Sequence, residues 1–227
     1  MKIIIIFILT TLFSFNLYSA EVRIINESIG DGLEIVNHSK VVVHYIGKLE
    51  NNTEFDNSYK RNQTFQFQIG VRQVILGWEE GLLGMKEGGK RTIYIPYELA
   101  YGENGAGELI PPKSDLIFDI EVVKVLPPGY KNIDSYQLKL AMSDNSFTIL
   151  DIRNLDEIKK TGKIPGSLIL TAFDKNGNFF PDFINKYQEI VLPGSKVIFV
   201  SENGIISSIL ANGFVEQLNQ INIYNLN

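Results

Sequence analysis

The sequence has no cysteine and only two histidines, His38 and His44. The lack of cysteine excludes disulfides, thiolate nucleophiles, iron–sulfur clusters and cysteine-based zinc sites. Two imidazoles are also too few for a histidine-rich metal centre. Any catalysis by this chain must therefore work without a thiol, and we expect neither a cofactor nor a metal.

Long basic runs are also missing, since 21 Lys and Arg stand against 26 Asp and Glu, for a formal net charge of −5. Because binding to phosphates needs clustered basic side chains, nucleic acid is not expected as a partner. The 227 residues, 44% of them hydrophobic, suffice for one large or two small domains with cores of their own.

The first 20 residues contain the longest apolar run. They combine a basic start, an apolar core and small residues before the first acid: Lys2, residues 3–13, Ser19 and Ala20. This pattern predicts a secretory signal peptide over residues 1–20, although Tyr18 is unusual three residues before the cleavage point. The core is shorter than the roughly 20 residues of a membrane span. A cleaved signal and an uncleaved N-terminal anchor both remain open, and both place residues 21–227 in the periplasm or outside the cell.

Proline and glycine mark a boundary inside the remaining chain. Pro127-Pro128-Gly129 follows an alternating strand pattern and precedes a new helical pattern. We therefore predict a linker over residues 129–135, between a domain of residues 21–128 and a domain of residues 136–227.

The two predicted domains differ in their hydrophobic patterns. In the first, residues 39–50, 64–69 and 114–125 have strand patterns, and residues 76–85 have the pattern of a short helix. These elements predict an α+β fold in which an antiparallel sheet wraps on the short helix. In the second, strand and helix patterns alternate over residues 147–150, 155–160, 197–200, 205–218 and 221–226. This alternation predicts a small α/β domain with a parallel sheet.

Aromatic residues occur on several elements of the first domain: Tyr45, Phe55, Phe65, Trp78, Tyr101 and Phe118. Each alone is more readily explained as part of a core. They fall, however, within three longer stretches, VHYIGKLENNTEFDNS, FQFQIGVRQVILGWEEGLLGMKEGGKR and IPYELAYGENGAGELIPPKSDLIFDIEV. In these stretches the chain resembles the FKBP-type peptidyl-prolyl cis-trans isomerases, over about residues 30–126.

The resemblance implies a pocket for a prolyl ring, with Trp78 at its floor. The catalytic residues that it implies are Tyr45, Phe55, Asp56, Tyr101 and Phe118. The substrate-binding residues that it implies are Arg61, Phe65, Val74, Ile75, Trp78, Leu109 and Ile110. Gln73 and Ala106 depart from the family, which commonly has a glutamate and an aromatic residue or histidine at these positions.

Such a pocket suits the reaction, because prolyl isomerisation breaks no σ bond. Its barrier of about 18–20 kcal/mol is lost amide resonance, so an aromatic cavity that removes water from the carbonyl favours the twisted state. By resemblance, the Ile75 amide and the Tyr101 hydroxyl would donate to peptide carbonyls, and Asp56 would orient the site. The alternative for Asp56 and Arg61 is an ordinary surface ion pair.

Three motifs of the second domain, TILDIR at 148–153, GKIPGS at 162–167 and VIFVSENG at 197–204, resemble the rhodanese-like family. Active members have a cysteine where this chain has Ser201, and an arginine where it has Ile206. A serine hydroxyl cannot carry a persulfide, so we expect a catalytically inactive domain. Docking, packing and anion binding by the loop of residues 201–207 remain open as its roles.

The sequence thus predicts a peptidyl-prolyl isomerase that acts on exported proteins. Its expected partners are proline-containing, unfolded or partly folded polypeptides, with macrolide inhibitors as further candidate ligands. The alternative is a periplasmic chaperone or adaptor that binds apolar segments with little isomerase activity. The sequence does not give the client proteins or the oligomeric state.

Overall fold

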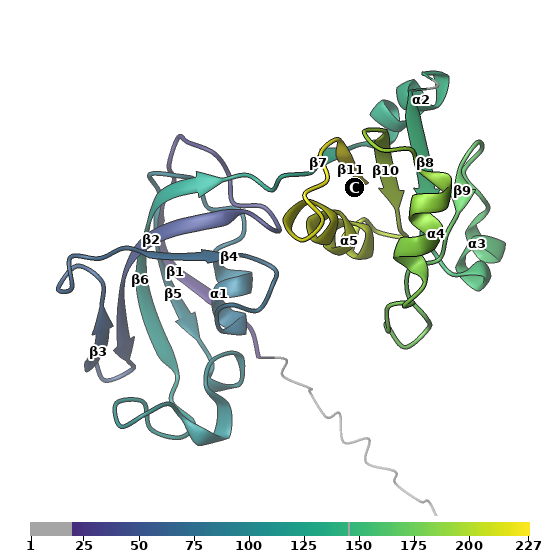
Figure 1. The fold of residues 1–227 in the computed structure, drawn as a ribbon. Coiled ribbons are helices and arrows are strands. Elements are labelled where there is room, and N and C mark those ends of the chain that lie inside the picture. The colour runs from purple at the N-terminus through teal and green to yellow at the C-terminus, as the bar shows by residue number, and fades with distance from the viewer. Residues whose placement is uncertain (1–19, 145) are drawn as a thin grey trace, which may run out of the picture.

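The computed structural model describes residues 20–144 and 146–227, which form two β-sheets with their helices (Figure 1). The predicted signal peptide lies outside the described residues, apart from Ala20. Within the described ranges, no helix is both long enough and apolar enough to cross a membrane.

The first sheet is antiparallel and has the strand order β1-β5-β6-β2-β3, with β4 paired to β2. Its strands are β1 (Arg23–Ser28), β2 (Lys40–Leu49), β3 (Glu54–Asn57), β4 (Phe65–Gln68), β5 (Lys90–Ile95) and β6 (Leu116–Leu126). Side chains alternate along β6, so that Leu116, Phe118 and Ile120 are buried on one face. The predicted strands 39–50, 64–69 and 114–125 are confirmed as β2, β4 and β6.

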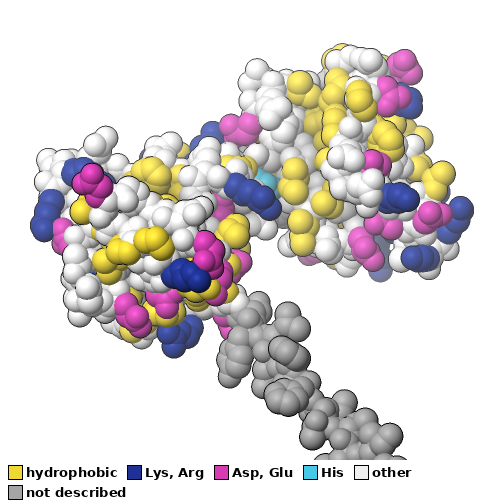
Figure 2. All heavy atoms as spheres, turned by 90° about the horizontal axis from the view of Figure 1, so that it is seen from below, with side chains coloured by type: hydrophobic (Ala, Val, Ile, Leu, Met, Phe, Trp, Pro, Cys, Tyr) yellow, Lys and Arg dark blue, Asp and Glu magenta, His cyan; other side chains and the backbone are white. Residues whose placement is uncertain are grey.

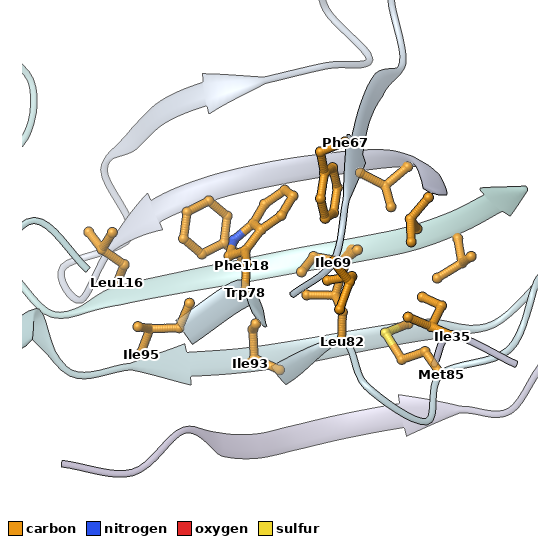
Figure 3. Close-up of a cluster of buried hydrophobic side chains, with 14 of the residues drawn as sticks. Ile35, Phe67, Ile69, Trp78, Leu82, Met85, Ile93, Ile95, Leu116 and Phe118 are labelled. Atoms are coloured by element: carbon orange, nitrogen blue, oxygen red, sulfur yellow. The ribbon is translucent and has the colours of Figure 1, made fainter. Parts of the chain in front are cut away.

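Helix α1 (Leu76–Gly81) packs against this buried face, and its Trp78 enters the core beside Phe118 and Ile95 (Figure 3). A β-carbon at Gly77 would lie 2.2 Å from Cγ2 of Ile95, so glycine is required for the helix to lie this close to β5. The prediction of a helix through residue 85 is wrong, because α1 ends at Gly81 and the chain turns through Gly84 at a φ of +76°. Leu82 still packs in the same core.

Two short 3-10 helices, η1 (Tyr97–Leu99) and η2 (Gly102–Asn104), lie between β5 and β6. Tyr101 stands between them, at the N-terminal boundary of η2. The loop that they form therefore carries a polar aromatic side chain between the end of β5 and the start of β6.

The second sheet is parallel, with the order β7-β11-β10-β8-β9. Its strands are β7 (Lys131–Ile133), β8 (Phe147–Asp151), β9 (Leu168–Ile169), β10 (Lys196–Val200) and β11 (Ile223–Leu226), and its helices are α2 (Ser135–Ser143), α3 (Leu155–Thr161), α4 (Phe183–Ile190) and α5 (Ile205–Glu216). Phe199 packs in a cluster with side chains of α4 and α5, and its neighbour Ile198 packs with side chains of α2. Both faces of the sheet are therefore covered, as expected for a parallel sheet.

The predicted fold class, an antiparallel α+β sheet on a short helix followed by a small parallel α/β sheet, is confirmed. Helices α2 and α3 begin where their sequences provide a capping box. Asp134 and Gln137 form the first box, and Asn154 and Glu157 form the second.

The two sheets meet in a packed junction at residues 129–135, the segment predicted as a linker. Residues 131–133 of this segment form β7, which pairs with β11, and Tyr130 belongs to the buried core of the second sheet. Nδ1 of His38 lies 2.8 Å from the hydroxyl of Tyr130. The segment therefore contacts the first half of the molecule through the Tyr130 side chain, and the second half through both its backbone and its side chains.

Candidate functional site

A cavity of about 380 Å³ opens in the first domain between α1 and the antiparallel sheet. It is lined by residues from β2, β3, β4, β6, α1 and two loops: Tyr45, Phe55, Asp56, Phe65, Arg72, Gln73, Val74, Ile75, Trp78, Tyr101 and Phe118. The fold thus brings together side chains that are more than 70 residues apart in the sequence.

Edge-to-face contacts build the aromatic part of the cavity. The Trp78 ring centroid lies 5.1 Å from those of Tyr45 and Phe118, with interplanar angles of 86° and 87°. Trp78 is 4% exposed, which makes it the floor of the cavity. A β-carbon at Gly47 would lie 2.6 Å from the Phe55 ring, so a larger residue there would displace this wall. The result is a rigid apolar surface.

The polar rim is centred on Asp56. Its carboxylate accepts hydrogen bonds from the Tyr45 hydroxyl and, at 2.7 Å, from the Asn57 amide, and it pairs with the Arg61 guanidinium. Nη2 of Arg61 also donates to the Tyr45 hydroxyl at 3.2 Å. Because the Arg61 side chain is 44% exposed, water screens this pair and its contribution is below about 1 kcal/mol. The network fixes the orientation of Asp56.

Unpartnered donors at the cavity, within residues 20–144 and 146–227, include the Ile75 backbone amide and the Tyr101 hydroxyl, and Nε1 of the buried Trp78 also has no hydrogen-bond partner. Partial burial raises the pKa of Tyr101, so its hydroxyl keeps its proton at neutral pH. The Ile75 amide and the Tyr101 hydroxyl can therefore both donate to a carbonyl of a bound molecule.

The loop of residues 70–75 forms one lip of the cavity and is held by side chains. The Glu79 carboxylate accepts from the amides of Gly70 and, at 2.8 Å, of Arg72. The backbone amide of Gln68 donates to Oε1 of Gln73 at 2.8 Å. These bonds hold the loop that leads to Ile75, the N-cap residue of α1, whose backbone amide lies at the cavity.

Three of the predicted site residues do not line the cavity: Arg61, Leu109 and Ile110. Arg61 contacts it only through Asp56 and Tyr45. Ile110 is 7% exposed and packs in the core, where its amide and carbonyl pair with Ala106. Leu109 is 64% exposed.

The sequence interpretation missed two residues that line the cavity, Arg72 and Gln73. The family resemblance marks Gln73 only as a departure from the family. The available clue was their position immediately before Val74 and Ile75, which both line the cavity.

In the second domain, the loop after β10 begins with Ser201. Its hydroxyl oxygen lies 2.8 Å from that of Ser207 and accepts from the Ser207 amide at 3.1 Å. Ile206 is exposed beside it. No cluster of metal-ligating side chains occurs in the part of either domain that the structure describes.

Comparison with known proteins identifies both halves of the chain. The family model "FKBP-type peptidyl-prolyl cis-trans isomerase" matches residues 32–123, and the model "Rhodanese-like domain" matches residues 134–227. An FK506-binding protein of Neisseria meningitidis serogroup B is 53% identical over 96 residues, which are 42% of this chain and 88% of that protein.

A chloroplastic peptidyl-prolyl cis-trans isomerase FKBP13 of Arabidopsis thaliana is 45% identical over 125 residues, covering 50% of this chain and 60% of that protein. The crystal structure of AtFKBP13 matches with 43% identity and a TM-score of 0.42, covering 46% of this chain and 91% of the other. The chain therefore belongs to the FKBP-type peptidyl-prolyl cis-trans isomerases, and a rhodanese-like domain follows its isomerase domain.

Proposed function

We propose that the aromatic cavity binds the prolyl ring of proline-containing polypeptides and that the enzyme accelerates isomerisation of their X-Pro bonds during the folding of exported proteins. The observation that carries this proposal is an apolar cavity of about 380 Å³ with two donors, the Ile75 amide and the Tyr101 hydroxyl, beside its aromatic floor. A ring-sized apolar group and its flanking carbonyls fit such a site.

The cavity lowers the barrier by favouring the twisted amide. In that state the imide nitrogen becomes pyramidal and the carbonyl loses negative charge, so removal of water costs the twisted state less than the planar one. Trp78, Phe55 and Phe118 provide the dry surface. Only interactions that are stronger in the twisted state raise kcat.

The polar groups hold the peptide in register. The Ile75 amide and the Tyr101 hydroxyl donate to two carbonyls of the bound segment. Asp56 is held by Tyr45, Asn57 and Arg61, so it orients the rim and the twisting carbonyl. No proton transfer is required, because no bond to hydrogen changes.

We assign catalysis to residues 21–128 and a recognition or positioning role to residues 136–227, where Ser201 replaces the cysteine nucleophile of sulfurtransferases. The pattern of residues 1–20 supports export to the periplasm, with unfolded or partly folded polypeptides as substrates and macrolides as inhibitors. Fractionation of cells that express the tagged protein tests this location. Recovery in the cytoplasm would contradict export.

The rate of cis-trans exchange in a short Leu-Pro peptide, measured by exchange NMR, tests the active site. Tyr101→Phe retains the ring and removes one donor, and we expect at least about a tenfold loss of kcat/KM, as for other transition-state donors. Tyr97→Phe is the matched control, because Tyr97 lies on the same loop but outside the cavity. Equal activity of Tyr101→Phe and the wild type would contradict the assignment.

A second candidate function is the binding of apolar segments with little isomerase activity. It is favoured by exposed apolar side chains on the second domain, among them Leu155, Leu168, Ile205, Ile206 and Ile209. Figure 2 shows hydrophobic groups at several places on the surface of this domain. In this case Tyr101→Phe would still suppress the aggregation of an unfolded protein. Loss of that effect together with isomerase activity would argue against it.

A further inference from the structure

Helix α5 of the second domain presents one side to the first domain (Figure 1). Asn212, Val215 and Glu216 lie on this side, at the i, i+3 and i+4 spacing of a helix face. Glu216 pairs with Lys40 of β2 at 3.0 Å, and a β-carbon at Gly129 would lie 2.4 Å from Val215. Of the two polar contacts on this side, that of Asn212 is the more buried, because its partner Gln68 is 9% exposed.

Gln68 connects α5 with the lip of the cavity. Its Nε2 donates to Oδ1 of Asn212 at 3.1 Å and to the carbonyl of His38 at 3.0 Å, so both amide hydrogens are used. Its backbone amide donates to Oε1 of Gln73 at 2.8 Å. One buried residue thus bonds to the second domain with its side chain and to the lip with its backbone.

The position of Gln73 explains what this connection can affect. Gln73 lines the cavity immediately before Val74 and Ile75, which also line it. The Ile75 amide is one of the donors available to a bound peptide. The opposite end of β4 carries Phe65, a wall of the same cavity. A shift of β4 therefore moves the Phe65 wall and, through the bond to Gln73, the lip that carries the Ile75 amide.

We propose that Asn212 is a positioning residue for prolyl isomerisation, and that it acts through Gln68 and Gln73 on the lip that presents the Ile75 amide. The second domain, which lacks a nucleophile of its own, thereby serves as a support for the active site of the first. This inference rests on the proposed function of the cavity. It gives the rhodanese-like domain a role in the reaction that requires no chemistry at Ser201.

The test compares two substitutions of similar size in the full chain. Asn212→Leu removes the acceptor for Gln68, whereas Asn212→Asp keeps it. Because substitutions along a connected network change coupling only modestly, we expect Asn212→Leu to lower kcat/KM for a Leu-Pro peptide about three- to tenfold. Asn212→Asp should retain wild-type activity. Glu216→Gln breaks the neighbouring ion pair only, and its activity should also be unchanged.

A binding measurement separates positioning from general destabilisation. Trp78 is the only tryptophan of the chain and forms the cavity floor, so its fluorescence reports peptide binding directly. Asn212→Leu should raise the Kd of the Leu-Pro peptide by a factor that accounts for most of the loss in kcat/KM. Gln73→Met, on the exposed lip, should have a similar effect. The double variant should be no worse than either single variant, because both break one connection.

Equal loss of activity in Asn212→Leu and Asn212→Asp would overturn the inference, because it would assign the effect to helix packing instead of the acceptor. Full additivity of Asn212→Leu and Gln73→Met would also overturn it. If the wild-type protein neither catalyses exchange nor shows saturable quenching of Trp78, the proposed function of the cavity fails first. An active wild type with an equally active Asn212→Leu variant would refute the positioning role alone.

Discussion

Nδ1 of His38 lies 2.8 Å from the hydroxyl of Tyr130, so a histidine of the first domain and a tyrosine from the core of the second share one buried contact. Burial lowers the pKa of His38 below its ordinary value of 6.5 and raises that of Tyr130 to about 12. Both side chains are therefore neutral at the junction near pH 7.

This contact predicts a loss of stability at acidic pH. The unfolded chain binds a proton at His38 near pH 6.5, whereas the folded protein binds it only at lower pH. The contribution of neutral His38 to the free energy of unfolding is therefore fully present above pH 6.5. It decreases as the pH falls below this value, and the decrease ends below the pKa of His38 in the folded protein. Urea unfolding at pH 7.5, 6.0 and 5.0 measures this change.

His38→Asn is the matched control for that experiment. His38 has a φ of +66°, a conformation that asparagine tolerates better than most residues, so the backbone should be retained while the titrating group is lost. Between pH 7.5 and 5.0, the free energy of unfolding of this variant should decrease less than that of the wild type. A decline equal to that of the wild type would assign the effect to other groups.

Two glycine-to-alanine substitutions should have opposite effects. Gly77→Ala places a methyl group 2.2 Å from Ile95 in the core and should destabilise the protein by about 1–3 kcal/mol. Gly213→Ala lies in α5 with no atom within 4 Å of the new methyl group, and should stabilise by about 0.5–1 kcal/mol. Chemical unfolding of both variants checks the signs, and stabilisation by Gly77→Ala would refute the packing of α1 on β5.

The buried ion pair of Asp151 and Arg153 should be important for the second domain. Asp151 is completely buried, and its carboxylate accepts from Arg153 at 2.8 and 2.6 Å. Asp151→Ala leaves the guanidinium without its partner and should destabilise by about 3–5 kcal/mol. The exposed Asp156 pairs with Lys159 at 3.3 Å, and Asp156→Ala should leave the unfolding midpoint unchanged. Similar midpoints for the two variants would contradict this prediction.

The rim of the cavity should tolerate the loss of Arg61 better than the loss of Asp56. An exposed ion pair contributes less than about 1 kcal/mol, so Arg61→Gln should lower kcat/KM less than about fivefold. Asp56→Ala should lower kcat/KM more than Arg61→Gln, because it leaves the Tyr45 hydroxyl without its acceptor. Prolyl exchange rates of the two variants decide this, and a larger loss in Arg61→Gln would require a direct role for the guanidinium.

Two kinds of hydrophobic pattern could be read from the sequence. In β6 buried and less buried residues alternate with the strand period, whereas in β10 four consecutive residues are buried, as in a parallel strand that is covered on both faces. All six residues of β1 are exposed, and its position depends on backbone pairing with β5, which leaves no hydrophobic pattern to detect. The helix ends at Gly81 because of a local turn. Trp78, Leu82 and Met85 keep the spacing of a helix face beyond this point, so the apolar pattern does not show where the helix ends.

The cavity could be anticipated residue by residue only through the family resemblance. Pattern analysis alone assigned aromatic residues such as Tyr45 and Phe118 to a core, and both do contact core side chains as well as the cavity. The bond between Gln68 and Asn212 joins residues 144 positions apart. Glutamine and asparagine have no periodic signature that would reveal such a partner.

The position of β7 has a consequence for the order in which the molecule can be completed during synthesis. The first sheet needs only residues up to 126, but β7 lies at the edge of the second sheet and pairs with β11, residues 223–226. β7 can therefore pair with its neighbour only after β11 has been synthesised. A newly made chain can close its aromatic cavity early, whereas the support of the lip by α5 arrives only when assembly of the second sheet is finished.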